Sequence, residues 1–270
     1  MKEPKKITYI AGVPRSGSSW LGQILNSSPV VKYSFQPLFA YEFKDRVDQD
    51  SKSEDFKSLL NNMYVKDSKF LNQIDKQGTG EYPIFQKNSD TPHLVFKEVR
   101  YHYLIEPMMR CCKNIKLIGI IRNPNAAINS WIKTPKEFPN GSDPLAEWRF
   151  GNCKNNGHED FFGYYKWKEV ANLYIDLKEK WPERVYVLSY EELVQAPKQI
   201  SKDLFEFCKI DYTKQTDEFL ERSTTAHIDS PYAVFKDNKV VSQWKIELNP
   251  YITKEIKNDI TGTRLERFIL

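Results

Sequence analysis

The sequence predicts an α/β fold in three layers, in which a parallel sheet is covered by helices on both faces. Apolar strand-like segments alternate along the chain with amphipathic helix-like segments, as in proteins with helical crossovers between parallel strands. Ile115–Ile121 (IKLIGII) is nearly continuous in its apolar character, which is typical of a strand buried on both faces. A glycine- and serine-rich turn joins the first strand to the first helix, which indicates a P-loop-type sheet.

The chain is organised around residues 8–26 (TYIAGVPRSGSSWLGQILN), an apolar strand that runs through this turn into a helix. Such a turn binds anions, because its N–H groups point inward and the helix dipole adds positive charge. Gly12 and Gly17 have the P-loop spacing, but Ser18 stands where nucleoside triphosphate-binding proteins carry lysine, and Arg15 is the only cation of the loop. We therefore expect a phosphate cradle for a different donor. A turn that only caps the helix is the alternative.

The remaining elements follow from apolar periodicity and turn residues. We expect strands at 30–35, 93–99, 115–121 and 185–189, and helices at 103–112, from 124, at 162–180, 190–208 and 214–222, and from 250. Residues 223–247 are expected to be irregular. Residues 1–270 are predicted to form one domain. In it, residues 40–80 are a helical insertion that covers the site and residues 134–160 are a long loop on the substrate side.

Composition limits the classes of function. A net charge of +4 does not by itself indicate a nucleic-acid binder, which needs a clustered basic face, but it is compatible with anionic ligands. The apolar run near the N-terminus is too short for a signal peptide or a membrane span, so we expect a cytoplasmic protein without membrane insertion. The 4 cysteines have no C-x-x-C spacing and are expected to be reduced, and no metal site is predicted.

Three marked segments fall where predicted strands end: residues 12–19, 97–100 and 122–130. Ligands of parallel sheets bind at the carboxyl ends of the strands, so these segments are expected to meet around one site. Arg122 closes the apolar strand and Ser130 lies in the helix that follows, where a guanidinium fork and a hydroxyl can share a further phosphate group. An Arg122 that pairs with a carboxylate is the alternative.

Three segments resemble the sulfotransferases that use 3′-phosphoadenosine 5′-phosphosulfate (PAPS). Residues 14–20 (PRSGSSW) look like that family's 5′-phosphosulfate loop, and residues 120–131 (IIRNPNAAINSW) look like its 3′-phosphate segment, with the Arg-x7-Ser spacing intact. Residues 187–197 (VLSYEELVQAP) are similar to its third segment, a strand that runs into Tyr-Glu-Asp-Leu. In motif style the chain is closest to bacterial and carbohydrate-type members. The resemblance implies PAPS as the donor, adenosine 3′,5′-bisphosphate (PAP) as the product, and no metal ion.

The resemblance also implies the residues of the donor site. Those that would hold the 5′-phosphosulfate are Arg15, Ser16, Gly17, Ser18 and Ser19, and those that would hold the 3′-phosphate are Arg122 and Ser130. Trp20 and Tyr190 would border the adenine. Near the C-terminus Trp244 and Lys245 resemble a Trp-basic pair of carbohydrate-type and bacterial members, and the lysines that would add charge at the 3′-phosphate are Lys236, Lys239 and Lys245. A solvated charged loop is the alternative there.

Lys97 matches the family's strand-end lysine, which contacts the transferring sulfuryl group. In-line sulfuryl transfer is loose, so charge grows on the oxygens around sulfur and a fixed cation stabilises it, by analogy with phosphoryl transfer. Arg15 is the second cation that the sequence predicts at this centre.

The base that takes the acceptor proton is not indicated by the family pattern. Val99 stands where one branch carries histidine, and Gln36 stands where other relatives carry glutamate before proline. The candidates are Glu98, Glu42 and His102, of which Glu98 is preferred because it lies at the end of its strand. Strand alternation weighs against Glu98, because it should face away from Lys97.

The resulting hypothesis is an enzyme that moves a sulfuryl group from PAPS to a hydroxyl on a saccharide, a lipid headgroup or a small metabolite. The acceptor pocket is expected from residues 40–80, 134–160 and 223–240. The alternatives are a kinase-like P-loop phosphotransferase, which predicts lysine after Gly17, and a nucleotide-binding homologue that has lost catalysis.

Overall fold

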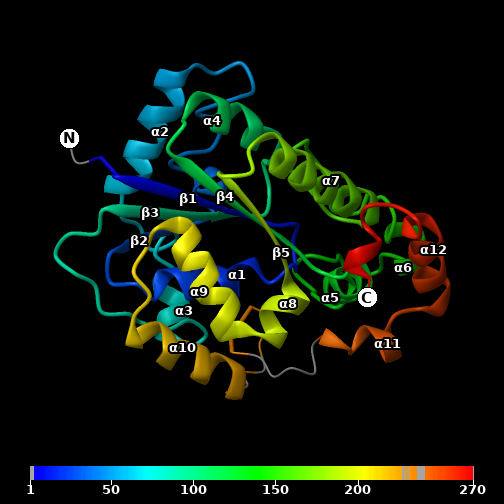
Figure 1. The fold of residues 1–270 in the computed structure, drawn as a ribbon. Coiled ribbons are helices and arrows are strands. Elements are labelled where there is room, and N and C mark those ends of the chain that lie inside the picture. The colour runs from blue at the N-terminus through cyan, green and yellow to red at the C-terminus, as the bar shows by residue number, and fades with distance from the viewer. Residues whose placement is uncertain (1–2, 227, 229, 231, 236–240, 270) are drawn as a thin grey trace.

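A parallel sheet of five strands crosses the molecule in the order β2-β3-β1-β4-β5 (Figure 1). The computed structural model describes residues 3–226, 228, 230, 232–235 and 241–269. The strands are β1 (Lys6–Ala11), β2 (Val31–Phe35), β3 (His93–Glu98), β4 (Ile115–Ile121) and β5 (Val185–Ser189). The α/β class and the three-layer arrangement predicted from the sequence are confirmed.

Side-chain alternation along the strands builds one apolar core on each face of the sheet. In β1, Tyr9 packs into one core and Ile10 into the other, and both side chains are fully buried. The helices of the first core are α2 (Ser53–Val65), α4 (Ile105–Cys111), α5 (Pro124–Ile132), α7 (Tyr164–Lys180) and α12 (Pro250–Ile260). The helices of the second core are α1 (Ser18–Asn26), α8 (Tyr190–Gln195), α9 (Pro197–Cys208) and α10 (Lys214–Thr225).

The shorter elements lie mostly around the carboxyl edge of the sheet. They are α3 (Ile74–Gly78), α6 (Pro144–Glu147), α11 (Trp244–Glu247) and the 3₁₀ turns Pro37–Phe39, His102–Leu104 and Glu266–Phe268. Within residues 40–80 the structure has α2 and α3, and within residues 134–160 it has α6. No helix among the described residues has both the length and the apolar character needed to cross a bilayer.

Two expectations about the helices were wrong. The helix predicted at 190–208 is two helices, because Pro197 has no N–H to continue α8 and instead opens α9, with Ala196 in a non-helical conformation (φ −133°, ψ 58°) between them. The segment predicted to be irregular at 223–247 contains the end of α10 and the whole of α11. The helix expected at 103–112 begins as a 3₁₀ turn before α4.

Gly119 lets α7 pack directly on β4. A Cβ atom at this position would lie 2.6 Å from Cδ2 and 2.7 Å from Cγ of Tyr174, whose ring is fully buried. A buried ring with no room to move cannot give way by this amount without displacing the helix.

We therefore expect Gly119→Ala to lower the free energy of unfolding by about 1–3 kcal/mol, the usual cost of overpacking a core. Urea denaturation measures it. Gly78→Ala in α3 is the matched control, since a Cβ there meets no atom within 4 Å, and it should be neutral or slightly stabilising. Equal unfolding midpoints for the two variants would contradict the packing described here.

Candidate functional site

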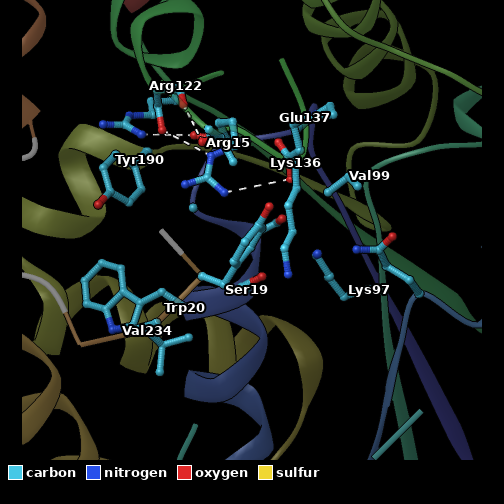
Figure 2. Close-up of a pocket in the computed structure, with 18 of the residues that line it drawn as sticks. Arg15, Ser19, Trp20, Lys97, Val99, Arg122, Lys136, Glu137, Tyr190 and Val234 are labelled. Carbon is cyan, nitrogen blue, oxygen red and sulfur yellow. Dashed lines mark hydrogen bonds and ion pairs between the residues drawn. The ribbon is translucent and has the colours of Figure 1, made fainter. Parts of the chain in front are cut away.

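A cavity of about 1060 Å³ lies at the carboxyl edge of the sheet and is bordered by the segments that follow β1, β3, β4 and β5 (Figure 2). Among the described residues, its cationic lining consists of Arg15, Lys69, Lys76, Lys97, Arg100, Arg122, Lys133, Lys136 and Lys154. The carboxylates of the lining are Asp75, Glu137 and Glu247. The excess of positive charge suits a polyanionic ligand.

The turn between β1 and α1 has the backbone conformation of an anion cradle. Arg15 and Gly17 both have positive φ angles, of 70° and 86°. A Cβ atom at Gly17 would lie 2.3 Å from Cδ2 of Tyr190, so glycine is required both by the backbone and by this close approach. Gly17, Ser18 and Ser19 line the cavity at the start of α1, where the first-turn N–H groups have no partner within the helix.

A chain of hydrogen bonds joins this turn to the segment after β4. Arg122 donates from Nη1 to the backbone carbonyl of Arg15 at 3.0 Å, and Arg15 donates from Nε to Oγ of Ser130 at 3.1 Å (Figure 2). The indole of Trp167 in α7 donates to the carbonyl of Arg122 at 2.9 Å, which fixes the end of β4. The Arg122 guanidinium lies 4.9 Å from the ring centroid of Tyr190, and burial lowers its pKa.

Aromatic side chains form the wall beside the first helix. Trp20 donates from Nε1 to Oγ of Ser223 at 2.9 Å and packs edge-on against Tyr190 with the ring centroids 6.2 Å apart. Tyr190 follows β5 directly, and the next residue, Glu191, accepts the N–H of Asn123 at 3.1 Å. The ends of β4 and β5 are therefore braced together behind the aromatic wall.

Lys97 enters the cavity from β3. Its side chain is 2% exposed, and its ammonium lies 4.4 Å from the centroid of the Phe35 ring. Burial lowers the pKa of Lys97 to about 7, although the nearby Glu98 opposes this shift. Gln36 and Val99 line the same cavity, and the backbone N–H of Gln36 donates to the carbonyl of Lys97 at 2.8 Å.

The structure places the three expected bases away from this cavity. Glu98 points to the other face of β3, is fully buried, and accepts the N–H of Leu38 through Oε1 at 2.6 Å. His102 is buried beside Tyr174, whose hydroxyl lies 3.2 Å from Nδ1, and burial lowers the pKa of His102 to about 3. Glu42 does not line the cavity. None of the three is retained as a base.

Two other expected ligand residues also lie outside the lining. Ser16 is fully buried under the turn, where its Oγ lies close to Gly12. In α11, Trp244 borders the cavity, whereas Lys245 is exposed and does not. Lys236 and Lys239 lie outside the described residues.

Three residues of the site, Glu137, Ser223 and Lys76, had no signal in the sequence analysis that singled them out as ligands or partners. Glu137 approaches Arg15, with 3.9 Å between Oε1 and Nη1, and Ser223 holds Trp20. Tyr232 and Lys76 come from the two segments expected at the acceptor side, and the Lys76 ammonium lies 4.9 Å from the Tyr232 ring centroid. In the described part of the chain, no group of three or more His, Cys, Asp or Glu residues is placed to hold a metal ion.

The buried carboxyl of Glu98 makes stability depend on pH. Burial raises its pKa from 4.5 to about 8, so between these values the unfolded chain has lost a proton that the folded protein keeps. The contribution of Glu98 to the free energy of unfolding is therefore fully present below about pH 4.5, and it is lost as the pH rises through about 8.

Glu98→Gln keeps the shape of the side chain and an acceptor for Leu38 but cannot ionise. We expect its melting temperature, measured relative to wild type, to rise steadily between pH 5 and pH 8. Differential scanning calorimetry across this range measures the difference in melting temperature. Lys97 also has a shifted pKa, but it is present in both proteins. A difference that does not change with pH would show that Glu98 does not titrate as described.

Comparison with known proteins identifies the family. A family model described as a sulfotransferase domain matches residues 5–262. No curated protein sequence matches the chain. Among solved structures, the mouse sulfotransferase SULT7A1 complexed with PAP has a TM-score of 0.56 at 14% identity, covering 100% of this chain and 89% of its own.

Two bacterial sulfotransferase structures resemble this chain to a similar degree. The sulfotransferase from Alicyclobacillus acidocaldarius has a TM-score of 0.55 at 15% identity and covers 100% of this chain and 96% of its own. The sulfotransferase domain of the olefin synthase from Synechococcus PCC 7002 has a TM-score of 0.53 at 16% identity, with 97% and 96% covered. At these identities the likeness shows a shared fold. The family match spans nearly the whole chain, and the protein therefore belongs to the sulfotransferase domain family of enzymes.

Proposed function

We propose that this enzyme transfers a sulfuryl group from PAPS to an acceptor hydroxyl on a saccharide, a lipid headgroup or a small metabolite. The observation that carries the proposal is the hydrogen-bonded link between two anion sites, the turn around Arg15 and the pair Arg122 and Ser130. A donor with one anionic group at each end of a nucleoside fits two such sites within one cavity. The PAP bound to the mouse relative supports the same donor class.

The proposed donor site has a separate contact for each part of PAPS. Gly17, Ser18 and Ser19 would receive the 5′-phosphosulfate at the start of α1. Ser130 accepts a hydrogen bond from Arg15, which leaves its own hydroxyl hydrogen to donate to the 3′-phosphate beside the Arg122 guanidinium. The adenine would lie along the wall of Trp20 and Tyr190.

Lys97 and Arg15 would act on the transferring group. As the sulfur–oxygen bond to the 5′-phosphate lengthens, negative charge grows on the bridging and equatorial oxygens, and fixed cations stabilise it. The buried Lys97 ammonium has little solvation to lose when this charge appears, because the fold has already removed most of its water.

The kinase-like alternative has less support. A P-loop phosphotransferase places lysine after the second glycine of the turn, and this chain has Ser18 there.

The acceptor side of the cavity would be lined by Lys69 and Lys76 from residues 40–80, and by Lys136 and Lys154 from residues 134–160. The named side chains of these segments therefore belong to the wall in which the acceptor would bind.

The donor assignment predicts selective binding of PAP. At about 100 times its dissociation constant, PAP should stabilise wild type by roughly 2.7 kcal/mol in a thermal shift experiment, whereas 5′-AMP and ATP with magnesium should stabilise it less. Arg122→Ala should abolish the response to PAP, because the 3′-phosphate loses its guanidinium partner. If ATP with magnesium stabilises wild type as well as PAP does, the phosphotransferase alternative replaces the proposal.

Lys97→Met tests the catalytic cation separately from binding. Removal of one fixed group that stabilises the transition state should lower the rate of transfer from [³⁵S]PAPS by about 10²–10³-fold. Calorimetry should give a PAP affinity within about twofold of wild type, since PAP lacks the sulfuryl group. A rate loss that merely follows weakened PAP binding would assign Lys97 to the donor site alone.

A further inference from the structure

Transfer to a hydroxyl needs a group that accepts the acceptor's proton, and Glu98, Glu42 and His102 do not line the cavity. The carboxylates that do line it among the described residues are Asp75, Glu137 and Glu247. Their oxygens differ in the hydrogen bonds and ion pairs that they already make, and this difference indicates which carboxylate can act as the base. The inference rests on the proposed function.

Glu247 and Asp75 do not suit the role. Glu247 accepts a hydrogen bond from Nδ2 of Asn129 at 2.8 Å through one oxygen and pairs with Nζ of Lys133 at 2.7 Å through the other. Its carboxylate therefore ties α11 to α5. Asp75 is exposed near the start of the short helix α3, on the rim of the cavity, where water competes for its oxygens.

Glu137 has a different environment. Its side chain is 23% exposed, and Oε1 lies 3.9 Å from Nη1 of Arg15, which is too long for a hydrogen bond. Oε2 is buried and accepts no hydrogen bond within the described part of the chain. A carboxylate inside a cavity with no hydrogen bond to either oxygen has its acceptor capacity available for a ligand.

Two hydrogen bonds hold the backbone of Glu137 in place. Its N–H donates to the carbonyl of Thr134 at 2.8 Å, and its own carbonyl accepts the indole N–H of Trp131 at 2.9 Å. Trp131 is buried in α5, one residue after Ser130. The carboxylate therefore stands at a defined place relative to the donor site.

The groups that face Glu137 are the ones expected around a sulfuryl group in transfer. Arg15 is the nearest ion-pair partner of Glu137. The charge of Glu137 also acts on Lys97, Lys76 and Tyr232. In Figure 2 a dashed line joins Glu137 to Arg15, and Lys97 is drawn below Glu137 among the residues that line the same cavity. A carboxylate beside these cations is placed to take a proton from an acceptor hydroxyl bound among them.

We propose that Glu137 is the catalytic base that accepts the proton of the acceptor hydroxyl. The acceptor oxygen forms a bond to sulfur while the sulfur–oxygen bond to the 5′-phosphate breaks. The electron pair of the broken bond stays on the 5′-phosphate of PAP. The acceptor proton moves to a carboxylate oxygen of Glu137 and is then released to water.

The test compares Glu137→Gln with wild type in the release of PAP from saturating [³⁵S]PAPS, with a mixture of glucose, glycerol and 4-nitrophenol as acceptors. Where none of these is sulfated, water serves as the acceptor, since it too must lose a proton. Glu137→Gln should lower kcat by at least about 100-fold, the lower end of the usual effect of a general base. Wild-type kcat should rise with pH along an acidic limb, and that limb should be absent in the variant.

Glu137→Asp should recover part of the rate, because it restores a carboxylate at a greater distance. Glu206→Gln is the matched control: it makes the same change at an exposed carboxylate of α9 that does not line the cavity, and its rate and pH profile should be those of wild type. A Glu137→Gln variant that binds PAP normally and turns over within about threefold of wild type, with the same acidic limb, would overturn the inference. Failure of wild type to bind PAP in calorimetry would instead overturn the proposed function.

Discussion

The hydrogen bond from the Arg122 guanidinium to the carbonyl of Arg15 is the contact on which the site depends. It holds a non-glycine residue in the left-handed conformation and joins the turn after β1 to the end of β4. Trp167 fixes Arg122 from behind, and Ser130 fixes the Arg15 side chain from the front. The turn after β1 and the residues after β4 are therefore held together as one unit at the ends of two neighbouring strands.

Side-chain alternation at the end of β3 points successive residues to opposite faces of the sheet. Lys97 and Val99 face the cavity, and Glu98 between them faces the other core, where its carboxyl holds the N–H of Leu38. That hydrogen bond anchors the 3₁₀ turn that follows Gln36, a residue of the cavity wall. A buried carboxyl beside Lys97 thus shapes the cavity without entering it.

Elements with strong local signals were predictable. The run of apolar residues in β4 predicted the observed bounds of that strand, and Pro124 predicted the observed start of α5. The break at Pro197 was predictable in principle, because an internal proline ends a helix, but the apolar pattern on either side obscured it. Strand alternation also predicted the orientation of Glu98. Glu98 was nevertheless preferred as the base because it lies at the end of its strand.

Contacts between distant segments were not predictable in the same way. Glu137 approaches Arg15 because the chain turns back after α5, and Ser223 meets Trp20 because α10 packs against α1. Neither residue belongs to a motif, and a single polar residue in a loop or on a helix has no periodicity that marks it. The strand, turn and helix of residues 6–26 are contiguous and were therefore predictable, whereas these contacts depend on tertiary packing.

We propose that one cavity binds a nucleotide by both of its phosphates, through two linked anion sites. A crystal structure of the protein with PAP tests it most directly. The account predicts the 5′-phosphate on the backbone N–H groups of residues 17–19 and the 3′-phosphate in contact with both Arg122 and Ser130. A bound nucleotide whose 3′-phosphate lies away from Arg122, or whose 5′-phosphate lies outside the turn, would contradict it.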